Sequence, residues 1–351
     1  MPGRSSSVPH RVLRRRRVGV CGGTRISAAN AAFCKRLGWE LAGEEGLTIV
    51  TGGFKYFAHD ANQPSTDWAT VDGALERLRV DGIPAETRID TLLPEKDVAN
   101  IVRFREGKTH VLRKRSLQAR RFTVVNAVDA LVAVQGSRGT QEMIDLALAL
   151  EKPCLPFPFT GGISAERWEE YQDVILESFD VDVETAKRMQ SIDLGTLPDE
   201  LLTELARDVM KLLLRRLKRK CFVMMPFSED YLPLYEKAIK PAIVEQGFQP
   251  VRADHLNLVG NAVEILRAAI SSCDCAVAVV TGNNPNVMYE LGFAHSQGKP
   301  AILVCESHEQ EPERFKDLPF DLRNEYVIGY RGRVEDLEQE IAIVLQELLH
   351  G

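Results

Sequence analysis

The chain has 351 residues, of which 44% are hydrophobic and 27% charged, and its formal net charge is −6. This length favours two globular domains, and the composition excludes a largely disordered protein. No segment approaches the run of about 18 apolar residues that a membrane helix requires, and the acidic balance argues against nucleic acid as a specific partner.

The start of the chain is basic and contains several serine and proline residues, with four consecutive arginines from Arg14 to Arg17. It lacks the apolar stretch of a signal peptide. We therefore expect residues 1–16 to form a disordered leader, with a basic arm for polyanions as the alternative.

Residues 17–160 alternate short apolar runs with helical patterns, which is typical of an α/β fold. Glycine follows or lies close to most of these runs, as expected at the ends of parallel strands. The runs are RVGVCGG (17–23), LTIVTGG (47–53), DALVAVQG (129–136) and KPCLPFP (152–158).

Residues 161–219 carry helical patterns and no convincing strand, and they end in an amphipathic segment. We expect this extension to pack on the first domain and to lead into the second. A helix for self-association is the alternative.

A second α/β series occupies residues 220–351 and has five strand-like runs, so the predicted fold class is α/β, with two doubly wound parallel-sheet (Rossmann-like) domains joined by a helical segment. The five runs are CFVMMPF (221–227), QPVRAD (249–254), CAVAVVTG (275–282), AILVCES (301–307) and YVIGY (326–330).

The seven cysteines form no CxxC pair, and most lie in or beside the apolar runs. Buried thiols in a reducing cytoplasm explain them better than disulfides or zinc. We expect a cytoplasmic protein without a bound metal or cofactor.

One acid, Glu290, interrupts the apolar helix pattern that follows CAVAVVTG. Asn284 is the expected N-cap and Pro285 the first helical residue, which places Glu290 in the second helical turn, on the margin of the apolar face. Ligands of open α/β sheets bind beyond the carboxyl ends of the strands, and the loop before this helix lies there. An exposed helix glutamate without a function is the alternative.

The segment NPNVMYELGFAHSQGKP, together with the runs before and after it, resembles the TIR-like and nucleoside 2-deoxyribosyltransferase-like superfamily over residues 220–332. The resemblance implies that Glu290 is catalytic in cleaving an N-glycosidic bond. The expected substrate-binding residues are Phe227, Asp254, Gly282, Asn286 and Tyr289. For Phe227 a core strand end, for Asp254 a loop or cap acid, and for Asn286 a loop-supporting role stay open as alternatives.

The proposed chemistry needs a carboxylate because breaking a ribosyl C–N bond passes through an oxocarbenium-like state, which an anion can stabilise or trap. Nicotinamide leaves NAD without protonation, whereas a neutral base usually needs a general acid. Many relatives have aspartate where this chain has Val279, and the loss of that acid favours NAD as the substrate.

Three glycine-containing loops of the first domain, GVCGGTR, IVTGG and VQGSRGTQE, follow strands and can hold phosphate through backbone amides. With the preceding arginine segment they resemble the SLOG superfamily, which includes the lonely-guy phosphoribohydrolases, over residues 17–160. The expected signal-ligand site comprises Gly22, Gly23, Thr24, Gly52, Gly53, Arg120, Gly136, Ser137, Gly139 and Thr140.

The pattern of those enzymes, PGGxGTxxE, is incomplete in this chain. Gln135 replaces the proline, Ser137 the second glycine and Met143 the glutamate, while Glu142 lies one residue early and is turned by about 100° on a helix. The domain is therefore expected to sense a ligand rather than to hydrolyse one, with glycine turns that bind nothing as the alternative.

Both resemblances together match the architecture of prokaryotic immune effectors. They imply an NAD glycohydrolase that a small nucleotide signal, such as a cyclic ADP-ribose derivative or a cyclic oligonucleotide, activates through homo-oligomerisation in antiphage defence. Two alternatives stay open: a nucleotide or deoxynucleotide N-glycosidase (or a deoxyribosyltransferase-like enzyme), and a nucleotide-binding regulator without catalysis.

Overall fold

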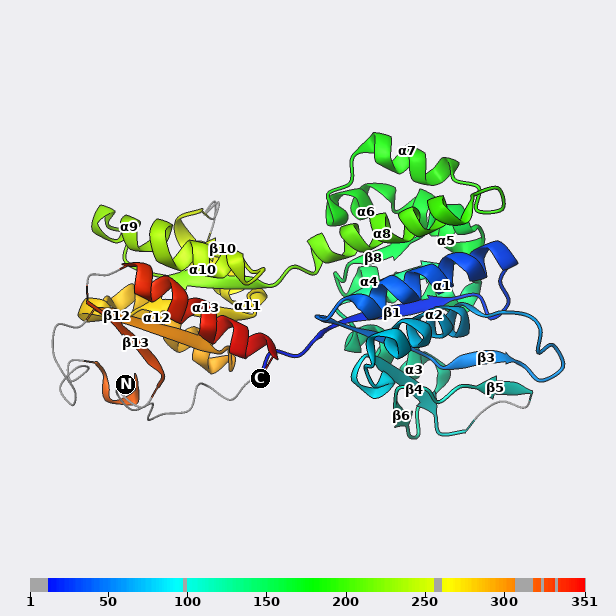
Figure 1. The fold of residues 1–351 in the computed structure, drawn as a ribbon, viewed down its shortest axis with the longest axis horizontal. Coiled ribbons are helices and arrows are strands. Elements are labelled where there is room, and N and C mark those ends of the chain that lie inside the picture. Colours follow the sequence, from blue (N-terminus) through cyan, green and yellow to red (C-terminus); the bar gives the residue numbers. More distant parts are fainter. Residues whose placement is uncertain are drawn as a thin grey trace. The chain divides into compact units, whose positions relative to one another are not determined.

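The computed structural model describes residues 12–96, 100–255, 261–306, 318–322, 325–331 and 334–350. The chain divides into two compact units (Figure 1). The first unit is Arg15–Leu217, and the second is Lys218–Gly351 together with the end of the basic leader. Both units are α/β and are built around a parallel sheet, so the predicted fold class is confirmed. The first eleven residues of the leader lie outside the described residues.

The first unit has a six-stranded parallel sheet in the order β6-β4-β2-β1-β7-β8. A separate antiparallel pair, β3 with β5, lies apart from it (Figure 1). The strands are β1 (Arg16–Gly22), β2 (Leu47–Thr51), β3 (Phe54–Phe57), β4 (Ile89–Pro94), β5 (Ile101–Arg103), β6 (Lys108–Leu112), β7 (Ala130–Val134) and β8 (Cys154–Pro156).

Helices cover both faces of this sheet, because its central strands alternate apolar side chains toward two cores. Val18 and Val20 of β1 belong to the core beneath α1 and α2, whereas Leu131 and Ala133 of β7 belong to the core with α4. The helices are α1 (Ala28–Gly43), α2 (Thr66–Asp81), α3 (Leu117–Ala127) and α4 (Arg138–Ala149), with short 3-10 turns at η1 (Ala85–Thr87) and η2 (Pro158–Thr160).

The helical extension belongs to the first unit and shares its main core. Trp168, Phe179 and Leu213 are buried in the same cluster as Phe33 of α1. Burial of these large side chains makes the extension a layer of the domain rather than a free linker. Its helices are α5 (Gly162–Glu170), α6 (Gln172–Phe179), α7 (Val183–Ser191) and α8 (Asp199–Arg216).

Helices α1 and α2 cross in close backbone contact. A Cβ on Gly38 would collide with the carbonyl oxygen of Thr70, and one on Gly73 with that of Lys35. We therefore expect Gly38→Ala to lower the free energy of unfolding by about 1–3 kcal/mol, as overpacking does. Urea denaturation measures this, with Gly46→Ala as the control, because a Cβ there meets nothing within 4 Å. Equal stability of both variants would contradict the close crossing.

The second unit has a five-stranded parallel sheet in the order β10-β9-β11-β12-β13, and all five expected runs form its strands. They are β9 (Lys220–Met224), β10 (Gln249–Arg252), β11 (Cys275–Val279), β12 (Ala301–Glu306) and β13 (Val327–Tyr330). Successive side chains of these strands point to opposite faces of the sheet and belong to two cores. One core includes residues of α10 and α13, and the other includes residues of α12.

The helices of the second unit are α9 (Leu232–Leu234), the π-helical turn η4 (Tyr235–Ile239), α10 (Lys240–Glu245), α11 (Ala262–Ser272), α12 (Pro285–Ser296) and α13 (Val334–His350). Short 3-10 turns lie at η3 (Glu229–Tyr231), η5 (Ala253–His255), η6 (Thr281–Asn283) and η7 (Phe320–Leu322). Asn284 caps α12 by accepting hydrogen bonds from the amides of Asn286 and Val287, so the predicted helix start is confirmed.

The end of the basic leader is ordered, contrary to expectation. Strand β1 already begins at Arg16. The amide of Leu13 donates to the carbonyl oxygen of Leu348 at 2.7 Å, and the Leu13 side chain packs against the core that includes α13. Leu348, the partner of Leu13, lies more than 300 positions away in the sequence, so a local sequence pattern does not reveal this contact.

Candidate functional site

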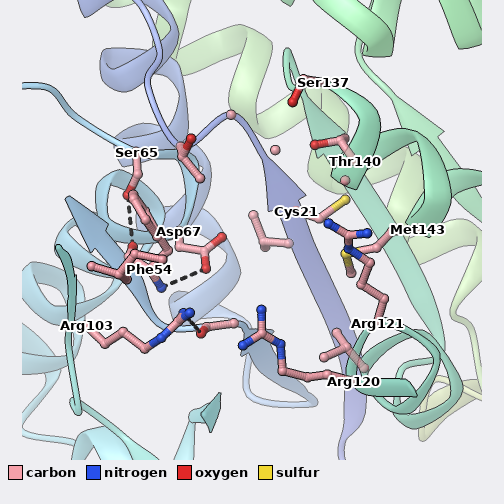
Figure 2. A pocket seen from close by; sticks show the side chains of 18 of the residues that line it. Cys21, Phe54, Ser65, Asp67, Arg103, Arg120, Arg121, Ser137, Thr140 and Met143 are labelled. Carbon is pink, nitrogen blue, oxygen red and sulfur yellow. Dashed lines mark hydrogen bonds between the residues drawn. The ribbon is translucent and has the colours of Figure 1, made fainter. Parts of the chain in front are cut away.

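A cavity of about 280 Å³ lies at the carboxyl ends of β1 and β7 in the first unit (Figure 2). The chain places β2, β4 and β6 on one side of β1 and then returns to lay β7 and β8 on the other. Such a reversal of strand order leaves a crevice between the two neighbouring strand ends, which is where ligands bind in open α/β sheets.

The cavity brings together most of the residues expected to hold a signal ligand. Eight of them line it: Gly22, Gly23, Thr24, Gly52, Arg120, Ser137, Gly139 and Thr140. Gly53 and Gly136 are not among the lining residues; they have positive φ values of 72° and 85° and turn the chain next to it. A Cβ on Gly136 would collide with the Thr140 side chain, so glycine is required there for packing.

The first turn of α4 forms an anion-binding end of this cavity. Ser137 occupies the N-cap position, but its hydroxyl does not cap the helix. Within the described part of the chain, the amides of Arg138 and Gly139 have no acceptor. Arg121 lies against Gly139, where a Cβ would press on its guanidinium. Free amides, the positive end of the helix and a guanidinium together suit a phosphate group.

Several lining residues were not anticipated from the sequence. These are Phe54, Phe57, Ser65, Asp67, Ile101, Arg103 and Arg121. Arg121 directly follows Arg120, which was expected in the site, so its position in the sequence could have identified it as a lining residue. The others come from β3, β5 and the start of α2, which the sequence pattern did not identify as parts of a site.

The side chains of Met143 and Glu142 point in different directions, as expected for two consecutive residues of a helix. Met143 lines the cavity, whereas Glu142 forms ion pairs with Arg121 and Arg138. The position that would hold the hydrolase glutamate therefore presents a thioether to the cavity.

Asp67 is the carboxylate that does line this cavity. Its Oδ2 accepts a hydrogen bond from the amide of Phe54 at 3.1 Å. Burial raises its pKa, and this effect is partly offset by hydrogen bonds from Phe54 and Thr51 and by the charges of Arg103 and Arg120.

The second unit has its own reversal of strand order, between β9 and β11. Phe227 follows β9 and is 63% exposed, and Gly282 follows β11 with a φ of 72°. Asp254 follows β10 and accepts a hydrogen bond from Arg252 at 2.5 Å. These three expected substrate-binding residues thus lie beyond the same edge of the sheet.

Glu290 is buried, with only 5% of its surface exposed, on the face of α12 that also carries Val287, Leu291 and Ala294. It lies deeper than the helix margin expected from the sequence. Among the described residues, the carboxylate has no hydrogen bond or ion pair. Burial alone raises its pKa from 4.5 to about 7.

The remaining two expected substrate-binding residues surround the start of α12. The amide of Asn286 is used in capping the helix. Tyr289 is turned toward α11, where its hydroxyl accepts hydrogen bonds from Nε and Nη2 of Arg267 at 2.9 and 2.6 Å. Contact with a substrate stays a prediction for both.

Val279 changes the sequence argument about the missing acid. Its side chain belongs to the core with α10 and α13, while Val280 belongs to the core with α12. Since successive side chains of a strand point to opposite faces, position 279 lies on the sheet face opposite Glu290. A valine there says little about whether a proton donor is present near Glu290.

Other classes of site find little support in the described residues. No helix there is both long and apolar enough to cross a membrane. In the same residues, no group of three or more histidine, cysteine or acidic side chains could hold a metal ion. All seven cysteines are buried free thiols, as predicted.

No protein-family model and no curated protein matches the sequence. Solved structures similar to this chain include a molybdenum cofactor binding protein from Rippkaea orientalis (19% identity, 56% of this chain and 98% of that chain, TM-score 0.33). The Moco carrier protein of Chlamydomonas rheinhardtii matches at 20% identity (46% and 86%, TM-score 0.32). A CMP N-glycosidase of Clostridium botulinum matches at 19% identity (36% and 99%, TM-score 0.27). At TM-scores below 0.5 these likenesses carry no argument about activity.

Proposed function

We propose that the protein is a nucleotide-activated N-glycosidase that cleaves the nicotinamide–ribose bond of NAD at Glu290. The observation that carries this proposal is the buried, unpaired carboxylate of Glu290. An ionised group without a partner in an apolar setting costs folding free energy, so packing gives no reason for it. Strongly perturbed acids of this kind are concentrated at functional sites.

The chemistry follows from the position of this acid beside the strand ends. As an anion, Glu290 stabilises positive charge that develops on the ribosyl ring or forms a bond to its anomeric carbon. Low polarity around it strengthens that interaction. Phe227, which is exposed beyond β9, offers a ring for stacking a base, and Asp254 offers an acceptor for ribose hydroxyls.

The cavity of the first unit serves as the signal site in this proposal. Its arginines and the free first turn of α4 suit a phosphorylated ligand, while Met143 stands in place of a catalytic acid. Binding of the signal drives homo-oligomerisation, which completes the site around Glu290. Depletion of NAD then makes the protein an antiphage defence effector.

The test is an assay for nicotinamide release from NAD across a panel of signalling nucleotides, with particle size followed in parallel. Because Glu290 acts as an anion in this scheme, the rate should rise from pH 6 to pH 8, with half of the change near pH 7. If no nucleotide elicits nicotinamide release in any assembled state, the proposal is wrong.

A second candidate is cleavage of a nucleotide that has a neutral base, and the pKa of Glu290 favours it. With a pKa of about 7, half of the carboxyl groups carry a proton near neutral pH and can protonate a departing base. In that case the rate should fall between pH 6 and pH 8. Release of free base and sugar phosphate, without nicotinamide release, would select this function.

A further inference from the structure

Arg252 is a buried arginine at the carboxyl end of β10, and the mechanism at Glu290 does not use it. Only 6% of its surface is exposed, although its guanidinium is charged. Within the described part of the chain, its Nε has no hydrogen-bond acceptor. A buried charge with an unfilled donor costs folding free energy, so packing alone does not explain an arginine at this position.

One contact of Arg252 is with the ring of Tyr235, whose centroid lies 4.2 Å from the central carbon of the guanidinium. Burial raises the pKa of Tyr235, and the charge of Arg252 is the largest influence in the opposite direction. Tyr235 is itself buried and begins the π-helical turn η4, a rare conformation that is frequent at functional sites. The ring is therefore a fixed support that holds the guanidinium in one orientation.

The other contact of Arg252 is with Asp254, the carboxylate expected to bind ribose hydroxyls. Nη2 of Arg252 donates to Oδ2 of Asp254 at 2.5 Å, and the side chain of Asp254 is 37% exposed. A buried cation thus holds a carboxylate that solvent can reach. Such a charged hydrogen bond restricts the direction in which the carboxylate points, so a ligand has less side-chain freedom to remove when it binds.

The side chain of Arg252 points to the sheet face opposite Glu290. Val251 packs against the core with α12, and successive side chains of a strand point to opposite faces. Tyr235, which Arg252 contacts, accordingly belongs to the core with α10 and α13. Because Arg252 is covered on that face, its effect on a ligand at the strand ends passes through Asp254.

We propose that Arg252 is a positioning residue, which holds Asp254 in the orientation that accepts a hydrogen bond from a ribose hydroxyl of the substrate. This role rests on the proposed function and deepens it, since it assigns two further residues to the same site. Tyr235 fixes the guanidinium, the guanidinium fixes the carboxylate, and the carboxylate binds the sugar. Orientation before binding raises affinity because less entropy is lost when the substrate arrives.

The experiment measures NAD affinity by isothermal titration calorimetry in the full chain with Glu290→Gln, so that no ligand is consumed. The conditions are those in which the protein without that substitution releases nicotinamide. Arg252→Met removes the guanidinium and keeps a long side chain on the ring of Tyr235. NAD should bind about tenfold more weakly or worse, the usual loss of one charged hydrogen bond. With Glu290 present, Arg252→Met should raise KM and leave kcat unchanged, as expected for uniform binding.

Urea denaturation separates positioning from support of the fold. Replacing a buried charge by an apolar side chain is often neutral or stabilising, and water can solvate the partly exposed Asp254 that remains. The urea midpoint of Arg252→Met should therefore not fall. A lower midpoint with unchanged NAD affinity would show that Arg252 only supports the fold, and it would overturn the proposal.

A double-mutant cycle with Asp254→Asn tests whether Arg252 acts through Asp254. In the Asp254→Asn protein, Arg252→Met should weaken NAD binding by less than about twofold, because the two residues act as one unit. Two independent losses, about 100-fold together, would mean that Arg252 acts on the ligand without Asp254 and would overturn the positioning role. Lys240→Met is the matched control, since Lys240 lies 5.8 Å from the centroid of the same ring but pairs with Glu236. It should leave NAD affinity unchanged.

The outcomes distinguish this role from the proposed function. If Arg252→Met does not fold, Arg252→Lys takes its place in the same cycle. Lysine keeps the charge but loses the planar guanidinium, so affinity should fall about threefold or more, and only while Asp254 is present. NAD that is bound and cleaved equally well with and without Arg252 overturns the role of Arg252 alone. A protein that neither binds nor cleaves NAD under any activating condition overturns the proposed function and this role with it.

Discussion

Glu290→Gln is expected to lower kcat for N-glycosidic cleavage by about 10²–10³-fold or more, the usual loss when a charged group that stabilises a transition state is removed. Glutamine keeps the shape of the side chain but cannot carry the negative charge. KM should change little, because the charge interaction is strongest in the transition state. Chromatographic measurement of the released base, in the activated assembly, gives both constants.

Glu245→Gln is the matched control, since Glu245 is an exposed acid of α10 in the same unit. It should retain the full rate. A Glu290→Gln protein that turns over within threefold of the unsubstituted protein would remove Glu290 from the mechanism and with it the proposed active site.

The same substitution is expected to stabilise the fold at alkaline pH. The pKa of Glu290 is raised from 4.5 to about 7 by burial, so the folded state holds a proton that the unfolded state has lost. Stability contributed by the protonated form is therefore fully present below pH 4.5 and is lost as the pH rises to about 7. The difference corresponds to about 3 kcal/mol. Glu290→Gln should be about neutral at pH 4.5 and up to about 3 kcal/mol more stable at pH 8.

Urea denaturation of both proteins at several pH values measures this difference without any substrate. Glu245→Gln should give parallel curves at all of them. A stability gain that is the same at pH 4.5 and pH 8 would mean that the Glu290 carboxyl does not titrate in the expected window, and it would contradict the buried ionisable site.

The sequence predicted all five strands of the second sheet because each is a short apolar run bounded by turn residues. In the first unit it missed β4 and β6. The run before Pro94 and the run around His110 carry polar residues inside the strands, for example Asp90, which pairs with Arg17 of β1. Local patterns cannot anticipate that β4, which lies between β6 and β2, tolerates an acid when a distant arginine pairs with it.

The candidate site of the first unit was predictable where glycine loops follow strands, since those loops mark the strand ends directly. Asp67 and Arg103 were not, because they come from the start of a helix and from a three-residue strand whose pairing with β3 depends on the tertiary fold. The depth of Glu290 was underestimated for a related reason. A helical wheel gives the direction of a side chain, but the cover over it comes from other elements.

The contact of Leu13 with Leu348 makes the first unit an insertion within the second, because chain on both sides of Arg15–Leu217 belongs to the same fold. The chain passes between the units twice, at residues 14–15 and 217–218, and the two passages are joined by one hydrogen bond within each unit. In the second unit Arg219 donates to the carbonyl oxygen of Arg14 at 2.6 Å, and in the first unit Arg16 donates to that of Leu217 at 3.2 Å. Two covalent links therefore join the first unit and the second unit. A protease must cut both links to separate the units, and an isolated second unit that begins at residue 218 lacks the residue that pairs with the end of α13.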